Sequence, residues 1–158
     1  MKNILLVIRT LLVSAFAFVF FLGSPQPLQA SSQQAVFAGG CFWCLEHDLE
    51  LLPGVQSVES GYTGGDLLNP TYRNHKGHQE AVVVTFDPAK ISYQKLLRSY
   101  WRNIDPLDGD GQFCDRGDSY RPVIFTSDES QRNDAISSSE AAALELGKLS
   151  RSIEVDFQ

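Results

Sequence analysis

The stretch that decides the fold is QAVFAGGCFWCLEHDLELL, from Gln34 to Leu52. Its start, Gln34–Ala38, is typical of a strand, and its end, Phe42–Leu52, is typical of an amphipathic helix. Two glycines, followed by Cys41, join the predicted strand to the predicted helix. The start of a helix presents unpaired N–H groups and the positive end of the helix dipole. We therefore expect Cys41 to be stabilised as a thiolate that acts as a nucleophile or redox centre.

The predicted helix carries its apolar residues on one face. Phe42, Leu45 and Leu49 recur at helical spacing and can face the core, whereas Trp43 lies off this stripe. A large aromatic side chain next to a cysteine and away from the core suggests the wall of a ligand pocket. The alternative is that the cysteines are small buried side chains and that Trp43 packs under a loop.

The first thirty residues have the pattern of a secretory signal peptide. Basic residues precede an apolar run from Leu11 to Leu22, and a possible cleavage site follows Ala30. The run is shorter than the roughly 20 residues that span a bilayer, and an uncleaved anchor is the alternative. We expect an exported protein, periplasmic or extracellular, with a signal at 1–30 and a single domain at 31–158.

The net charge and the number of cysteines argue against a nucleic-acid-binding protein and against a disulfide scaffold. The 158 residues carry a formal net charge of −6, which disfavours nucleic acid as a partner. Three cysteines are too few for a disulfide scaffold, and the odd number leaves at least one thiol unpaired. The composition therefore favours redox chemistry over disulfide stapling.

Short strands and helices alternate beyond the signal, without an internal repeat. The expected elements are strands Gln34–Ala38, Val55–Gly61, Glu80–Phe86, Val123–Phe125 and near Ile153–Phe157, and helices Phe42–Leu52, Ser92–Ile104 and Asp128–Ser150. The second helix has a continuous apolar stripe that includes Trp101, and Ser127 is expected to cap the third. One mixed sheet covered by these helices predicts an α+β fold, a two-layer α/β sandwich.

Two long loops are expected to build the site. If Cys41 attacks an electrophile whose leaving atom is oxygen, an acid must protonate that oxygen. Glu80 precedes an apolar strand, where desolvation would raise its pKa and keep it a proton donor; the alternative is a solvated carboxylate. Tyr72 and Tyr120 could donate hydrogen bonds to the oxygen or simply pack, and Asp115 could orient such donors or shape a turn.

Six motifs occur in the order of a known family. They are GCFWC at 40–44, GYTGG at 61–65, NPTY at 69–72, GHQEAVVVTFDP at 77–88, IDP at 104–106 and DRGDSYR at 115–121. Over about residues 35–125 the chain resembles the peptide methionine sulfoxide reductase A family. The resemblance implies a two-layer domain with a ferredoxin-like mixed sheet core. It also implies reduction of methionine S-sulfoxide, free or in proteins, without a metal or bound cofactor.

The resemblance also implies roles for the residues at matching motif positions. Cys41 would attack the sulfoxide sulfur, and Glu80 would be the acid. The other roles would fall to Tyr72 and Tyr120, which hold the sulfoxide oxygen, to Asp115, which supports the site, and to Phe42 and Trp43, which line the methyl pocket.

The attack would leave a sulfenic acid on Cys41, which a second thiol condenses into a disulfide. Cys44 lies at the spacing of redox C-x-x-C pairs, and Cys114 adjoins Asp115; we favour Cys44 and leave Cys114 open. A thioredoxin-like protein outside the cytoplasm would then reduce the disulfide.

The expected partners are therefore methionine sulfoxide, in oxidised proteins or free, and this reductant. We expect a monomer that meets a membrane only through an uncleaved signal. Relatives continue beyond the last strand, so we expect this chain to be truncated at its C-terminus, and an inactive fragment is an alternative.

Other classes would use the cysteines differently. A thioredoxin-like disulfide oxidoreductase would also place C-x-x-C at a helix start but would need neither Glu80 nor Tyr72. A papain-like protease does not fit the motif or the length. A zinc module would need an irregularly spaced ligand set: Cys41, Cys44, His47 and Cys114. His47, His75 and His78 otherwise read as surface or loop residues.

Overall fold

The computed structural model describes residues 31–147 and 155–158. The predicted signal peptide therefore lies outside the described residues, as do the end of the predicted third helix and the start of the predicted last strand. Within the described ranges, no helix combines the length and the apolar character needed to cross a membrane.

A five-stranded mixed sheet forms one layer, in the order β2-β3-β1-β6-β7. Its strands are β1 (Gln33–Ala38), β2 (Val55–Thr63), β3 (Gln79–Phe86), β6 (Val123–Phe125) and β7 (Asp156–Phe157). Antiparallel pairs join β2 to β3, β3 to β1 and β1 to β6, while β7 runs parallel to β6. The sheet confirms the predicted α+β class.

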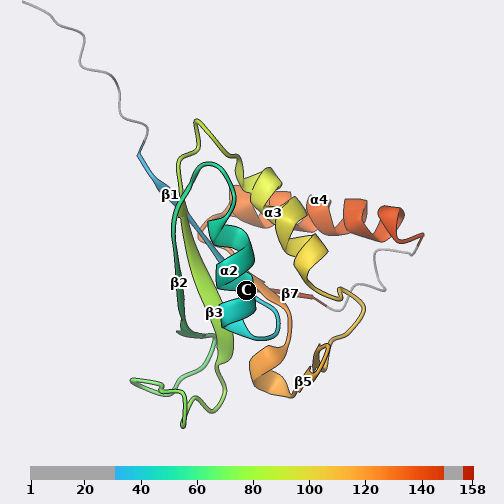
Figure 1. Cartoon of the computed structure of the whole chain (residues 1–158). Coiled ribbons are helices and arrows are strands. Elements are labelled where there is room, and N and C mark those ends of the chain that lie inside the picture. The colour runs from blue at the N-terminus through green and yellow to red at the C-terminus, as the bar shows by residue number, and fades with distance from the viewer. Residues whose placement is uncertain (1–30, 148–154) are drawn as a thin grey trace, which may run out of the picture.

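The α-helices of the described residues form the second layer, to one side of the long strands (Figure 1). They are α2 (Phe42–Glu50), α3 (Tyr93–Asn103) and α4 (Glu129–Glu145). Buried side chains between the layers form the core, among them Phe37, Val82 and Val84 of the sheet, Leu45 and Leu49 of α2, and Leu96, Leu97 and Tyr100 of α3. Strand β3 lies between β2 and β1 in the sheet and is buried along most of its length.

Helix α3 confirms the predicted apolar stripe and contacts both the sheet and α4. Its N-cap residue Ser92 accepts a hydrogen bond from the Lys95 N–H at 3.3 Å. Trp101 is buried as expected, and its indole N–H donates to Ser138 Oγ in α4. The buried Tyr100 hydroxyl donates to the Ala38 carbonyl at 2.9 Å. This last bond holds the end of β1 directly before the glycines that lead to Cys41.

Two expectations about local structure are wrong. Asp128, not Ser127, is the N-cap of α4, and its carboxylate accepts from the Gln131 N–H at 2.8 Å. The Ser127 N–H donates to Gln131 Oε1, and the N-cap therefore lies one residue later than predicted. The second long loop, expected between the helix Ser92–Ile104 and the strand Val123–Phe125, also contains three short elements that are too short to show periodicity in the sequence: β4 (Gly111–Gln112), β5 (Asp115–Arg116) and the 3₁₀ helix η1 (Asp118–Tyr120).

The turn between β1 and α2 leaves no room for side chains. Gly40 has φ +82°, and a Cβ there would lie 2.9 Å from Gln112 Cβ. Gln112 is fully buried, and its amide bonds to the Asp105 N–H and to the Asp105 and Asp108 carbonyls. The loop after α3 is therefore locked against the turn that carries Cys41.

We predict that Gly40→Ala destabilises the protein by about 1–2 kcal/mol or more, because an L residue is strained at this φ and meets Gln112. Chemical denaturation measures the change. Gly61→Ala is the matched control, since a Cβ at Gly61 meets nothing within 4 Å. Equal stability of the two variants would contradict a tightly packed turn.

Candidate active site

Cys41 is the N-cap residue of α2 and is half-buried. Its carbonyl accepts hydrogen bonds from the N–H groups of Cys44, at 3.0 Å, and Leu45, at 3.4 Å. The Gly40 N–H donates to the Tyr120 carbonyl at 3.0 Å, which ties the turn to η1. The thiol thus lies at the positive end of the helix dipole, as predicted from the strand-glycine-helix pattern.

Glu80 lies at the start of β3 and is only 2% exposed, which excludes the solvated alternative. Its Oε2 accepts a hydrogen bond from the Phe42 N–H at 3.3 Å. Burial raises the pKa of Glu80; the Phe42 N–H and His75 act against this, and Asp115 adds to it. Because Phe42 directly follows Cys41, a carboxyl biased toward its protonated form stands beside the thiol.

Tyr120 and Tyr72 approach the same place from two loops. Partial burial raises the pKa of Tyr120, and the nearby Glu80 and Asp115 raise it further, followed by Tyr72 and Cys41. Four of the predicted site residues thus lie close enough to Tyr120 to act on its charge. Their catalytic roles stay predictions.

An aromatic wall borders this cluster. The ring of Trp43 stacks on Tyr72, with centroids 5.7 Å apart and planes at 17°, and the two residues are 57% and 60% exposed. Phe42 lies beneath, buried in the core, with its ring 5.0 Å from Trp43. Trp43 therefore faces solvent rather than packing under a loop, and a ligand can reach it.

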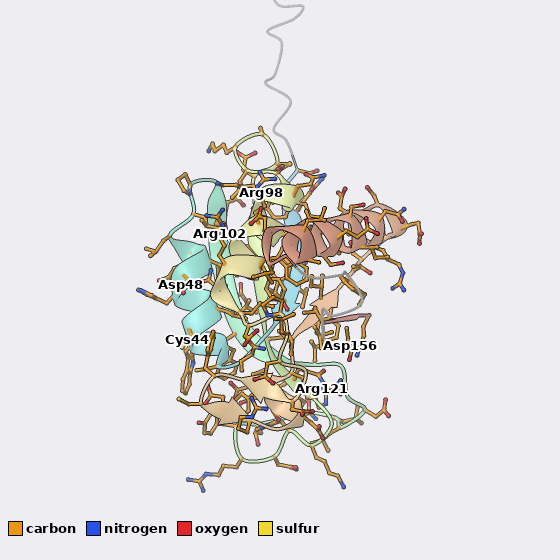
Figure 2. All side chains as sticks on the ribbon, turned by 90° about the vertical axis from the view of Figure 1, so that its right-hand side faces the viewer. Cys44, Asp48, Arg98, Arg102, Arg121 and Asp156 are labelled. Carbon is orange, nitrogen blue, oxygen red and sulfur yellow. The ribbon has the colours of Figure 1, made fainter. Side chains whose placement is uncertain are left out.

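A small cavity lies beside Cys41. This cavity of about 60 Å³ is lined by Cys41, Cys44, Asp48, Phe113 and Asp115, together with Gly39, Gly40, Leu45 and Asn103. Figure 2 shows Cys44 and Asp48 along α2. All three cysteines are free thiols; Cys44 and Cys114 are both exposed, but Cys44 lines this cavity and Cys114 does not.

The electrostatics of Cys44 agree with this arrangement. Desolvation of its sulfur raises the pKa of Cys44, and the neighbouring Cys41, Asp115 and Asp48 raise it further. The Cys44 thiol is therefore near Cys41 and is biased toward its protonated form.

His78 is a loop histidine, one of the two expected alternatives, but it is buried and does not lie at the surface. His78 is 6% exposed; its Nδ1 accepts from the Gly65 N–H at 3.3 Å, and its Nε2 donates to the Leu67 carbonyl at 3.0 Å. It joins the two ends of the loop that carries Tyr72. The local sequence shows no apolar pattern that would reveal this burial.

The zinc alternative gains no support. In the described part of the chain, no group of three or more His, Cys, Asp or Glu side chains is arranged to hold a metal ion. His47 lies on the exposed side of α2, 3.9 Å from Glu50.

We predict that Glu80→Gln raises the midpoint of thermal unfolding at neutral pH. A carboxyl whose pKa is raised by folding stabilises the folded state fully only below its unfolded pKa, and this contribution is lost as pH rises through the folded pKa. The neutral amide is free of that loss. The gain should therefore vanish below about pH 4, where the carboxyl is protonated in both states. A gain that does not depend on pH would contradict a buried, shifted Glu80.

Residues 33–157 match the family model described as peptide methionine sulfoxide reductase. The chain is 57% identical over 123 residues to peptide methionine sulfoxide reductase MsrA 2 of Caulobacter vibrioides, which covers 74% of this chain and 63% of that relative. It is 53% identical over 132 residues to MsrA of Ligilactobacillus salivarius, covering 81% of this chain and 76% of that protein.

Solved structures show the same arrangement. Methionine sulfoxide reductase A of Corynebacterium diphtheriae matches with a TM-score of 0.70 and 30% identity, over 77% of this chain and 59% of that chain. Mxr1 from Saccharomyces cerevisiae in reduced form shares the fold, with a TM-score of 0.72 and 22% identity, over 83% of this chain and 76% of that chain. The matched region thus spans less than two thirds of the Caulobacter and Corynebacterium relatives. The family model nevertheless covers most of this chain, and the chain belongs to the peptide methionine sulfoxide reductase family.

Proposed function

We propose that this protein reduces methionine S-sulfoxide, in oxidised proteins or as the free amino acid, to methionine. One contact carries the proposal beyond family membership: the Phe42 N–H donates to Glu80 Oε2 at 3.3 Å, beside Cys41. A nucleophile at a helix N-terminus and a buried acid next to it are the two groups that sulfoxide reduction requires.

The first step uses Cys41 and Glu80 together. The Cys41 thiolate attacks the sulfoxide sulfur, and Glu80 protonates the oxygen as negative charge develops on it. The oxygen leaves the methionine sulfur and becomes the sulfenic acid of Cys41. The methionine sulfur gains two electrons and the cysteine sulfur loses two, so thiols supply the reducing power and no resident cofactor is needed.

The oxygen and the methyl group have separate surroundings. Tyr72 and Tyr120 are proposed to donate hydrogen bonds to the oxygen, which stabilises the developing charge. Burial first, and the Asp115 charge in addition, favour the protonated forms of Glu80 and Tyr120, which is a physical basis for a supporting role of Asp115. The exposed face of Trp43 suits the methyl group.

The second step is proposed to use Cys44. Its thiol condenses with the Cys41 sulfenic acid to form an S–S bond, and water leaves with the oxygen. The cavity that Cys44 shares with Cys41 supports this choice over Cys114. A thioredoxin-like protein would then reduce the disulfide. Mxr1 has been solved in complex with Trx2, a pairing consistent with such a partner. The signal pattern at 1–30 favours an exported location for both proteins.

Single-turnover reduction of an S-sulfoxide tests the proposed function. The pre-reduced protein should convert about one equivalent of the S epimer of a chromophore-labelled methionine sulfoxide and none of the R epimer, because only one configuration directs the oxygen toward Glu80. Cys41→Ser should convert neither. Disulfide reduction without sulfoxide turnover by a folded chain would favour the disulfide oxidoreductase instead.

Cys44→Ala and Cys114→Ala form a matched pair for the resolving step. We predict that Cys44→Ala completes one turnover and accumulates a sulfenic acid that dimedone traps, but does not cycle with thioredoxin. Cys114→Ala should cycle like the wild type. The reverse pattern would move the resolving role to Cys114.

A further inference from the structure

Tyr62 is the tyrosine of the GYTGG motif, and no role has so far been assigned to it. It lies in β2 directly opposite Glu80 in β3, in the register of the antiparallel pair. Directly paired residues project from the same face of a sheet, with Cβ atoms about 5 Å apart. Tyr62 and Glu80 are therefore side-chain neighbours, although they are distant in sequence.

Aromatic rings hold the Tyr62 side chain on two sides. Its ring stacks on His75, with centroids 4.6 Å apart and planes at 14°, and it is tilted against Phe42 at 5.5 Å. These contacts hold the ring in one orientation, and the position of the hydroxyl is therefore fixed as well.

The Tyr62 hydroxyl is buried and has no hydrogen-bond partner among the described residues. Leaving a buried donor unpaired costs about 1–3 kcal/mol, and few such groups occur in folded proteins. Functional sites are one of the places where such groups are kept. An unpaired O–H in a site thus indicates a bond that is completed by a ligand.

The groups around this hydroxyl identify the ligand atom. Partial burial raises the pKa of Tyr62, and Glu80, Tyr72 and Tyr120 raise it further. These three groups are the ones proposed to handle the sulfoxide oxygen. The Tyr62 hydroxyl thus belongs to the same cluster and remains a proton donor at neutral pH.

We propose that Tyr62 is a further catalytic residue, whose hydroxyl donates a hydrogen bond to the sulfoxide oxygen of the substrate. It acts with Tyr72 and Tyr120 as a third phenolic donor. The bond strengthens as Cys41 attacks, because electron density moves onto the oxygen before Glu80 protonates it. This inference rests on the proposed function, since it names a donor for that reaction.

Tyr62→Phe tests the inference because it removes the hydroxyl and keeps the ring that packs on Phe42 and His75. In single turnover with methionine S-sulfoxide, the rate should fall about 10–1000-fold. The shape of its pH profile should not change. A fall that comes with a shifted profile would show that Tyr62 acts through Glu80, and it would overturn direct contact with the oxygen.

Tyr93→Phe is the matched control. The Tyr93 hydroxyl is also buried without a partner, but it lies in α3, where its ring stacks on Phe37. Tyr93→Phe should leave the single-turnover rate unchanged. Neither substitution should lower the thermal unfolding midpoint, because neither removes a hydrogen bond. A rate loss in Tyr62→Phe that is explained by unfolding, or shared by Tyr93→Phe, would overturn the inference.

Two measurements separate this inference from the proposed function. Alkylation of Cys41 by iodoacetamide should proceed equally in wild type and Tyr62→Phe, which localises the defect to the oxygen. If wild type reduces the S-sulfoxide and Tyr62→Phe does so at the same rate, only the role of Tyr62 falls. If folded wild type does not reduce it, the proposed function falls, and the role of Tyr62 with it.

Discussion

The hydrogen bond from the Phe42 N–H to Glu80 connects the start of α2 to the start of β3. It brings the positive N-terminal end of α2 next to the buried carboxyl of Glu80, and these two features have opposite effects on the charge of that carboxyl. A helix N-terminus favours anions, whereas the buried position of Glu80 disfavours its charged form. For Glu80, burial is the larger effect and the carboxyl stays biased toward the acid. Cys41, at the same end of α2, is only half-buried and lies at the positive end of the helix dipole.

Several groups around Cys41 have arrangements that cost free energy of folding. Gly40 adopts a positive φ, Gln112 is buried with its amide bonded to Asp105 and Asp108, and the Tyr62 hydroxyl is buried without a partner among the described residues. The nearby bond from Tyr100 to the Ala38 carbonyl and the apolar core beneath it offset such costs. A strained backbone position at Gly40 and an unpaired hydroxyl at Tyr62 thus lie close to the reactive groups, a combination that is common in functional sites.

Cys41 stands between two surroundings. One contains Glu80, the tyrosines and the Trp43 wall, and it suits a polar oxygen beside a methyl group. The other is the small cavity shared with Cys44 and Asp115, which suits a second thiol. In the proposed reaction, reduction and resolution would use the same sulfur in succession, each step in one of these surroundings. The raised pKa of Cys44 favours its protonated form, so in the proposed reaction it would compete little with Cys41 for the substrate.

Local sequence alone determined the elements whose pattern repeats over three or four residues or alternates along a strand. The α3 stripe, the apolar run of β3 and the position of Cys41 at a helix start were all predictable, because each depends on neighbours close in sequence. The motif resemblance also pointed to Glu80 and Tyr72. Tertiary structure decided what lies across from what: Tyr62 opposite Glu80, and His78 buried between the ends of its loop. These contacts depend on strand register and loop closure, which join residues that no local periodicity relates.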